Sequence, residues 1–249
     1  VFDRAYEEMN GPQMCCLWSS ELIPPDTVRQ YLDSQTGLLY QITENTKTID
    51  YIEKDGTRLS NGILLELPER INSEMLSPKM LGSEEPDMPG KNEIWITTKI
   101  ANILGLAVGD SVSLQLADKA VTVSVAKIVA DPVFGSSSTN VYRMWCGSGR
   151  LSEFPLAENN TVSYLEIRFE EYSRQMEQNF IRDAEEYFKL PLGDTLYTYE
   201  RIRSGYTAAY QMVGAALSFV SVVLAGMIAV LTLFLVKSDM DEDVRNIGI

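Results

Sequence analysis

A run of 26 positions without a charged side chain, from Gln211 to Val236, is the feature that most constrains this chain. The hydrocarbon core of a bilayer is about 30 Å thick and needs roughly 20 apolar helical residues to cross it. Helices of soluble proteins are usually shorter and keep a polar face, so a central helix of a large soluble protein is the weaker interpretation. The run predicts a transmembrane helix that follows about 205 water-exposed residues.

The net charge of −14 restricts the kinds of partner that this chain is expected to bind. The segment 237–249 contributes −2 of that charge, so the remaining −12 lies before Tyr206. Nucleic acids and anionic head groups both attract clustered Lys and Arg, so the acidic balance argues against nucleic acid as a partner. Membrane lipid is expected only around the apolar run.

The few cysteines and the absence of histidine limit the chemistry. Cys15, Cys16 and Cys146 form no recognisable framework, and without histidine neither the usual zinc sites nor Ser-His and Cys-His pairs can be built. Adjacent strand residues point to opposite faces, so Cys15 and Cys16 cannot line one pocket. Burial of at least one is expected, and a bridge to Cys146 stays open. We expect no catalytic residue, cofactor or metal, and therefore no enzyme.

Both ends of the water-exposed part repeat one pattern of a strand, a helix and a strand. The expected elements are 13–19, 24–35 and 37–43 at one end, and 165–169, 171–189 and 196–199 at the other. A hairpin of 48–52 and 63–67 is expected to turn at Lys54-Asp-Gly and Ser60-Asn-Gly. The fold class predicted is α+β, with a split βαβ (ferredoxin-like) subdomain made of 11–71 and 160–201.

A second module is expected inside the first. Residues 72–91, which hold three prolines, read as a linker, and 92–154 as an inserted small β-rich subdomain. Its expected elements are strands at 93–96, 111–116 and 120–130 and a helix at 98–104. Asp110 of the Gly109-Asp110 turn is interpreted as a turn former rather than a ligand. The aromatic group of Phe134, Tyr142 and Trp145 with Met144 is either a contact patch or core packing.

Two local patterns together resemble a known family. The first is Asn92 to Leu114, which contains Leu104-Gly-Leu-Ala-Val-Gly-Asp, followed by Ala126-Lys-Ile-Val. It resembles the extracytoplasmic core domain of MacB-like and FtsX-like ABC transporter permeases. The second, Asp243-Val-Arg-Asn-Ile-Gly-Ile after an apolar helix, looks like the start of that family's cytoplasmic segment.

The resemblance implies a layout and partners. Residues 1–10 are then a stalk after a missing first membrane helix, 1–205 are extracytoplasmic, 202–210 continue as a stalk helix, 211–236 are the second helix, and 237–249 begin the segment that touches the ATPase. The implied location is the bacterial cytoplasmic membrane, and the implied partners are a cytoplasmic ABC ATPase dimer and a second permease copy or half. ATP hydrolysis belongs to the separate ATPase subunit. The contact residues implied are Asp243, Arg245, Asn246, Ile247, Gly248 and Ile249.

Small residues at helical spacing mark one face of the apolar run. This stripe, where another membrane helix can approach, comprises Gly214, Ser218, Ser221, Ala225 and Ala229. Charge does not orient the helix, because Arg201 and Arg203 on one side balance Lys237 and Arg245 on the other. Orientation therefore rests on the resemblance.

The function expected is that of a permease subunit which couples ATP hydrolysis to movement of an external domain, in export, lipoprotein handling or mechanotransmission. Two alternatives stay open. One is a single-pass, membrane-anchored binding or adhesion protein. The other is a cell-division regulator of the FtsX type that acts on a peptidoglycan hydrolase.

Overall fold

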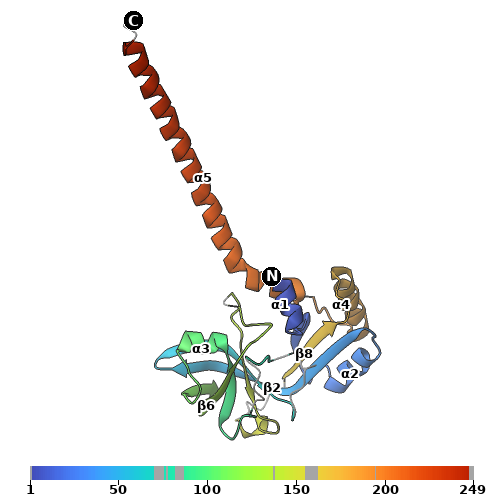
Figure 1. The fold of residues 1–249 in the computed structure, drawn as a ribbon. Helices are drawn as coiled ribbons and strands as arrows, with labels where there is room; N and C mark the ends of the chain where they lie inside the picture. Colours follow the sequence, from blue (N-terminus) through green and yellow to red (C-terminus); the bar gives the residue numbers. More distant parts are fainter. Residues whose placement is uncertain are drawn as a thin grey trace. The chain divides into compact units, whose positions relative to one another are not determined.

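The computed structural model describes residues 2–69, 76, 78–81, 87–136, 138–154, 162–193 and 195–246. The chain forms two compact units, Val1–Tyr206 and Thr207–Ile249. The first mixes strands and helices, so the expected α+β class is confirmed (Figure 1).

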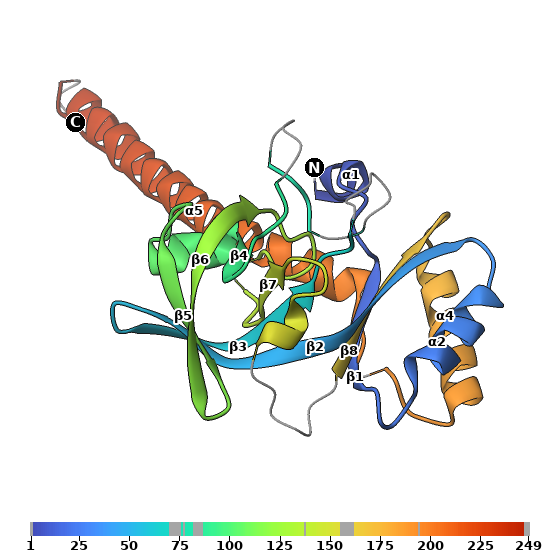
Figure 2. The same ribbon diagram turned by 90° about the horizontal axis from the view of Figure 1, so that it is seen from below.

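Six strands of the first unit close into a barrel (Figure 2). Their order is β3-β7-β4-β6-β5-β2, and β2 pairs again with β3. Helix α3 packs Ile100 and Leu104 into the apolar core of this barrel. The elements are β2 (Leu38–Lys54), β3 (Thr57–Glu66), β4 (Glu93–Thr97), α3 (Thr98–Leu104), β5 (Ser111–Leu116), β6 (Lys119–Val129), β7 (Tyr142–Cys146) and the short 3-10 helix η1 (Leu151–Glu153).

A second sheet, with the order β9-β1-β8-β2, carries two helices on one face (Figure 2). Its neighbouring strands are all antiparallel, with α2 between β1 and β2 in the chain and α4 between β8 and β9. Buried side chains of both helices form an apolar layer against the sheet. The elements are β1 (Met14–Ser19), α2 (Pro25–Asp33), β8 (Val162–Phe169), α4 (Arg174–Phe188) and β9 (Tyr197–Thr198).

Strand β2 joins the two sheets. Its first half pairs with β8 and its second half with β3 and β5. The pairing with β8 shifts register between Thr43 and Thr46, and Asn45 there has a φ of 54°. An irregularity of this kind bends a strand and increases its twist, which lets one strand serve both sheets.

The structure corrects the expected boundary at residue 71. Because β2 and β3 are barrel strands, the barrel extends beyond the expected insertion 92–154. The sequence pattern also missed β7, which pairs with both β3 and β4. Its sequence shows no clear alternation of polar and apolar residues, and Arg143, Met144, Trp145 and Cys146 are all buried.

One of the two expected hairpin turns is confirmed. Asp55 and Gly56 connect β2 to β3, and both have the positive φ that a tight hairpin turn requires. Ser60-Asn-Gly is wrong as a turn, because it lies inside β3. Gly62 is needed there for another reason: a Cβ atom at this position would lie 2.7 Å from Cβ of Ile49 on β2.

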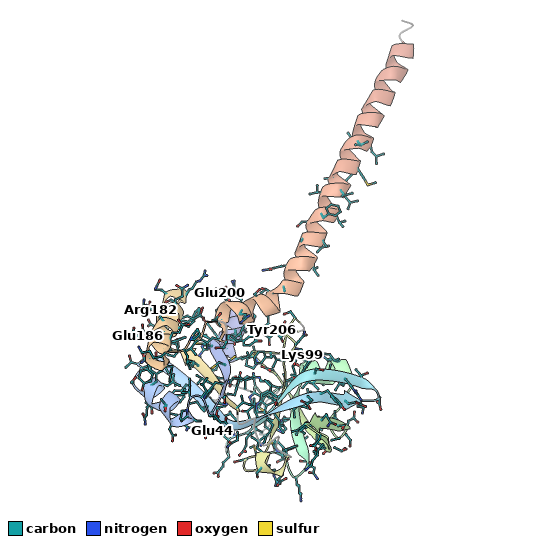
Figure 3. All side chains as sticks on the ribbon, turned by 180° about the vertical axis from the view of Figure 1, so that it is seen from behind. Glu44, Lys99, Arg182, Glu186, Glu200 and Tyr206 are labelled. Carbon is teal, nitrogen blue, oxygen red and sulfur yellow. The ribbon has the colours of Figure 1, made fainter. Side chains whose placement is uncertain are left out.

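Most of the cysteines and of the aromatic group are buried in the core, while Cys16 and Tyr142 are partly buried. Cys15 and Cys16 point to opposite faces of β1, as expected, and all three cysteines are free. Phe134, Met144 and Trp145 are buried, so packing is the correct alternative for them. Figure 3 shows α4 with Arg182 and Glu186 labelled, both exposed, as expected for the charged face of an amphipathic helix.

The first helix and the last helix complete the fold. They are α1 (Phe2–Glu8) and α5 (Tyr199–Asn246). Within α5, Val213–Thr232 has a mean hydropathy of 2.4, and it is long and apolar enough to cross a membrane by length and composition. Its large side chains are exposed, as a bilayer-facing helix requires.

Candidate functional site

The first unit contains a buried ion cluster between its two sheets, which we define as Asp131, Arg143, Glu166 and Tyr164. Arg143 on β7 donates from Nε to Asp131 Oδ2 at 2.8 Å and from Nη1 to Glu166 Oε1 at 2.7 Å. The same Nη1 lies 2.7 Å from the Tyr164 hydroxyl. The Arg143 side chain has no exposed surface. These bonds therefore tie a barrel strand to a strand of the second sheet, because Glu166 and Tyr164 belong to β8.

Each carboxylate of this cluster has a positively charged side chain near it. Glu166 interacts electrostatically with Lys79, so a second cation faces the second carboxylate. The coulombic attraction of Asp131 helps to keep the pKa of Arg143 well above its usual range, although burial alone would lower it. Aromatic rings of Phe134 and Trp145 flank the guanidinium at 5.2 and 5.3 Å. A buried ion pair of this kind is costly to break from one side.

Asp131 also shapes the loop 131–141 between β6 and β7. Its Oδ1 accepts the backbone N–H groups of Val133 and Phe134 at 2.8 and 3.0 Å. Lys99 on α3 then holds the rest of the loop, because its ammonium donates to the carbonyls of Phe134 and Val141 and to the Thr139 hydroxyl. Burial lowers the pKa of Lys99 to about 8. The loop is thus fixed to both the ion cluster and α3.

The start of α5 is attached to this loop. The Tyr206 hydroxyl donates to the carbonyl oxygen of Asp131. Ser136 and Ser138 both donate to the carbonyl oxygen of Gly205, at 2.6 and 2.7 Å. A Cβ atom at Gly205 would lie 3.2 Å from the Ser138 hydroxyl, so a small residue lets the helix approach.

Helix α1 joins the same assembly. Phe2 stacks on Tyr206 with ring centroids 5.3 Å apart, and Tyr6 meets Tyr199 edge-on at 5.6 Å. Asp3 accepts from the Tyr199 hydroxyl at 2.7 Å and pairs with Arg203 at 2.9 Å. We call α1, residues 199–206 and the loop 131–141 the helix-root contact. Figure 1 shows the N-terminus beside the beginning of α5.

The residues singled out from the sequence lie elsewhere. Asp243, Arg245 and Asn246 are in the last turns of α5, while Ile247, Gly248 and Ile249 lie outside the described residues. The stripe is helical throughout, with Ser221 donating back to the Leu217 carbonyl, and a Cβ atom at Gly214 would meet nothing. Both sets stay predictions.

Asp110 behaves as expected of a turn former. Its Oδ2 accepts the backbone N–H of Ala107 at 2.9 Å, and Lys54 lies 3.4 Å from the same oxygen. In the described part of the chain no group of His, Cys, Asp and Glu could hold a metal ion. The sequence reasoning missed the ion cluster, since Asp131, Arg143 and Glu166 are far apart in the chain. The only local signal was an arginine inside an apolar segment.

Comparisons with known proteins add two similar structures. In sequence the chain matches no family model and no curated protein. The periplasmic region of MacB from Actinobacillus actinomycetemcomitans is similar over 79% of this chain and 94% of that chain, at 8% identity and a TM-score of 0.39. A domain assigned to a permease protein from Porphyromonas gingivalis is similar over 76% of this chain and 89% of that chain, at 10% identity and a TM-score of 0.35.

Proposed function

We propose that this chain is part of a permease subunit of an FtsX/MacB-like ABC transporter, with residues 1–206 as its extracytoplasmic domain. The motif that carries the resemblance, Asn92 to Leu114, forms the strand, short helix, turn and strand typical of that family's core domain. The antiparallel order β9-β1-β8-β2 with two helices on one face fits a split βαβ sheet. The apolar helix Val213–Thr232 fits a membrane span.

The helix-root contact is the observation that carries the proposal furthest. An external domain held between two membrane helices needs the points where the chain enters and leaves it to lie together. Helix α1 and residues 199–206 do so, joined by stacked rings and the pair Asp3–Arg203. Tyr206 bonds in turn to the loop 131–141, and this loop is bonded to the ion cluster between the two sheets. A displacement of residues 199–206 would therefore be passed to both sheets through this loop and the ion cluster.

ATP hydrolysis would occur on a separate ATPase subunit bound near the end of α5. Arg245 can pair with a carboxylate of the partner, but an exposed ion pair contributes only about 0 to 1 kcal/mol. Ile247 and Ile249 would supply the apolar anchor. We therefore expect Ile247 and Ile249 to contribute more to binding of the ATPase than Arg245 does.

The test uses the full-length protein in membranes with its ATPase. Ile247→Asp should abolish co-purification of the ATPase or its stimulation, while Arg245→Ala should have the milder effect. Normal binding and stimulation with Ile247→Asp would remove this segment from the mechanism.

Orientation is tested separately with a Leu22→Cys variant, since Leu22 is 66% exposed. A membrane-impermeant maleimide added to intact cells should label it and leave the wild type unlabelled. Labelling only after the cells are broken would contradict an extracytoplasmic domain. External labelling without any associated ATPase would instead favour the membrane-anchored binding protein.

A further inference from the structure

The first half of β2 is an edge of the second sheet. Within the described residues, 38–43 pair with β8 alone, whereas residues 51–53 of the same strand pair with both β3 and β5. The carbonyl oxygen of Gly37 accepts the N–H of Glu170. This bond fixes which residues of the strand pair their backbone groups with β8 and which point them outward. The backbone groups of Leu39 and Thr43 therefore face β8, and those of Leu38, Tyr40 and Ile42 face outward. Such a row of outward donors and acceptors is a template for another strand.

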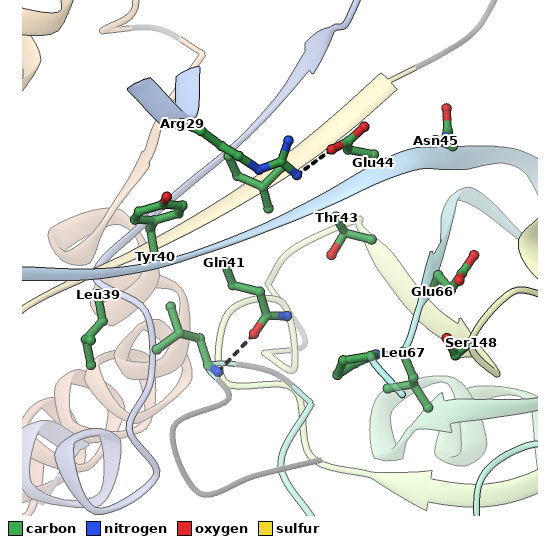
Figure 4. A pocket seen from close by; sticks show the side chains of 13 residues that line it. Arg29, Leu39, Tyr40, Gln41, Thr43, Glu44, Asn45, Glu66, Leu67 and Ser148 are labelled. Atoms are coloured by element: carbon green, nitrogen blue, oxygen red, sulfur yellow. Dashed lines mark hydrogen bonds and ion pairs between the residues drawn. The ribbon is translucent and has the colours of Figure 1, made fainter. Parts of the chain in front are cut away.

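A groove with a volume of about 520 Å³ runs along this edge (Figure 4). Residues 39–45 all line it. Because successive side chains of a strand point to opposite faces, the groove includes both faces of this edge. Leu39, Leu67 and Pro68 give it an apolar part, and Leu39 is 43% exposed. Leu76 also lines the groove and is held by Gln41, whose Oε1 accepts the backbone N–H of Leu76. The volume is within the range typical of ligand sites.

The charges in the groove are acidic in sum. Arg29 is its one cation among the lining residues, and it already pairs with both Asp26 and Glu44. Glu66 at the other end accepts a backbone N–H from Gly149 but faces no cation in the described ion pairs. The chain as a whole carries −14, so its field also favours a basic partner.

We propose that the groove binds an extended, basic segment of a partner polypeptide, which adds as a strand to residues 38–43 of β2. Its backbone would pair with Leu38, Tyr40 and Ile42, an apolar side chain would contact Leu39 and Leu67, and a Lys or Arg would face Glu66. Strand addition takes affinity from main-chain bonds and specificity from alternate side chains. The groove is distinct from the helix-root contact, so this inference goes beyond the permease proposal and does not depend on it.

The test uses the whole chain in neutral detergent micelles and a fluorescent, end-blocked octapeptide in which lysine alternates with valine. Binding is measured by fluorescence anisotropy. Two further peptides serve as controls, one with glutamate in place of lysine and one with alternate backbone nitrogens methylated. The lysine peptide should bind at least about tenfold more tightly than either control.

Matched variants locate the site. Leu39→Lys places a cation in the groove and should weaken the lysine peptide at least about tenfold. Leu22→Lys makes the same change at a position that does not line the groove, and should leave binding unchanged. Glu66→Gln should weaken the peptide and reduce the salt dependence of binding.

Amide exchange resolved at single residues by NMR reports on the pairing itself. The N–H groups of Tyr40 and Ile42 should exchange fast in the free protein and slow down when the peptide binds, whereas those of Leu39 and Thr43 should be slow in both states. Slow exchange at Tyr40 and Ile42 without peptide would mean that the edge is already paired, and would overturn the proposal. Equal binding of the methylated peptide, or equal weakening by Leu22→Lys, would also overturn it.

Discussion

Arg143 on β7 donates a hydrogen bond to Glu166 on β8 at 2.7 Å, and this buried bond joins the barrel to the helix-covered sheet. The two residues belong to sheets that share only strand β2. The same guanidinium holds Asp131, whose carbonyl receives the Tyr206 hydroxyl at the start of α5. One arginine therefore fixes three parts of the first unit.

Replacing this arginine should be severely destabilising. Arg143→Leu leaves Asp131 buried without its cation and Glu166 with Lys79 alone, so we expect the free energy of unfolding to fall by about 3–5 kcal/mol. Chemical unfolding of the full chain in micelles, followed by tryptophan fluorescence, measures it. Arg150→Leu is the control, because the Arg150–Glu153 pair is on the surface and should contribute about 0 to 1 kcal/mol.

Neutral replacements for the two carboxylates should restore part of the stability that Arg143→Leu loses. The triple variant Arg143→Leu, Asp131→Asn, Glu166→Gln removes both carboxylate charges of the cluster and should be more stable than Arg143→Leu alone. A triple variant no more stable than the single one would show that the apolar contacts of Arg143, rather than its charge, hold the sheets together.

Tyr206→Phe should loosen the helix-root contact without disturbing the core. The change removes one hydroxyl and its bond to Asp131, and we expect a loss of about 0.5–1.5 kcal/mol. Faster amide exchange in residues 199–206 should accompany it. Tyr51→Phe is the matched control, since the Tyr51 hydroxyl makes only a 3.4 Å contact with Gln115. Equal effects of the two substitutions would argue against a special role for Tyr206.

Lys99 should give the stability a distinctive pH dependence. Burial lowers its pKa to about 8 in the folded chain from 10.5, so between these pH values the unfolded chain binds more protons. The contribution of Lys99 to stability should therefore rise as the pH increases from about 8 to 10.5. The difference in unfolding free energy between wild type and Lys99→Met isolates it, because other titrating groups are common to both. A difference that stays constant from pH 7 to 10 would contradict this expectation.

The three thiols should be unreactive in the folded chain. Burial raises the pKa of Cys16 and of Cys146 to about 12, and that of Cys15 also rises. Because the thiolate is the reactive form, a disulfide reagent at pH 8 should label the native protein very slowly and all three thiols after unfolding. Rapid labelling of the native protein would show that one thiol is accessible. Above pH 9 the unfolded thiols ionise first, so this burial should cost stability as the pH rises towards 12.

The sequence alone determined the elements whose signals are local. The uncharged run, the four-residue apolar spacing of α4, the turn at Asp55-Gly56 and the alternation in β6 depend on neighbours within a few positions, and each was predicted. The opposite faces of Cys15 and Cys16 follow from the geometry of any strand. These features need no knowledge of what packs against them.

Only the tertiary structure decided how the strands are shared and where the charges meet. Nothing near Asn45 shows that β2 continues through a bend into a second sheet, and Ser60-Asn-Gly resembles a turn until Ile49 is seen opposite Gly62. The sequence near Asp131 and Glu166 does not show that these carboxylates are buried against Arg143. Their burial is tolerable only because folding brings them within hydrogen-bonding distance, and that proximity depends on the pairing of strands distant in the chain.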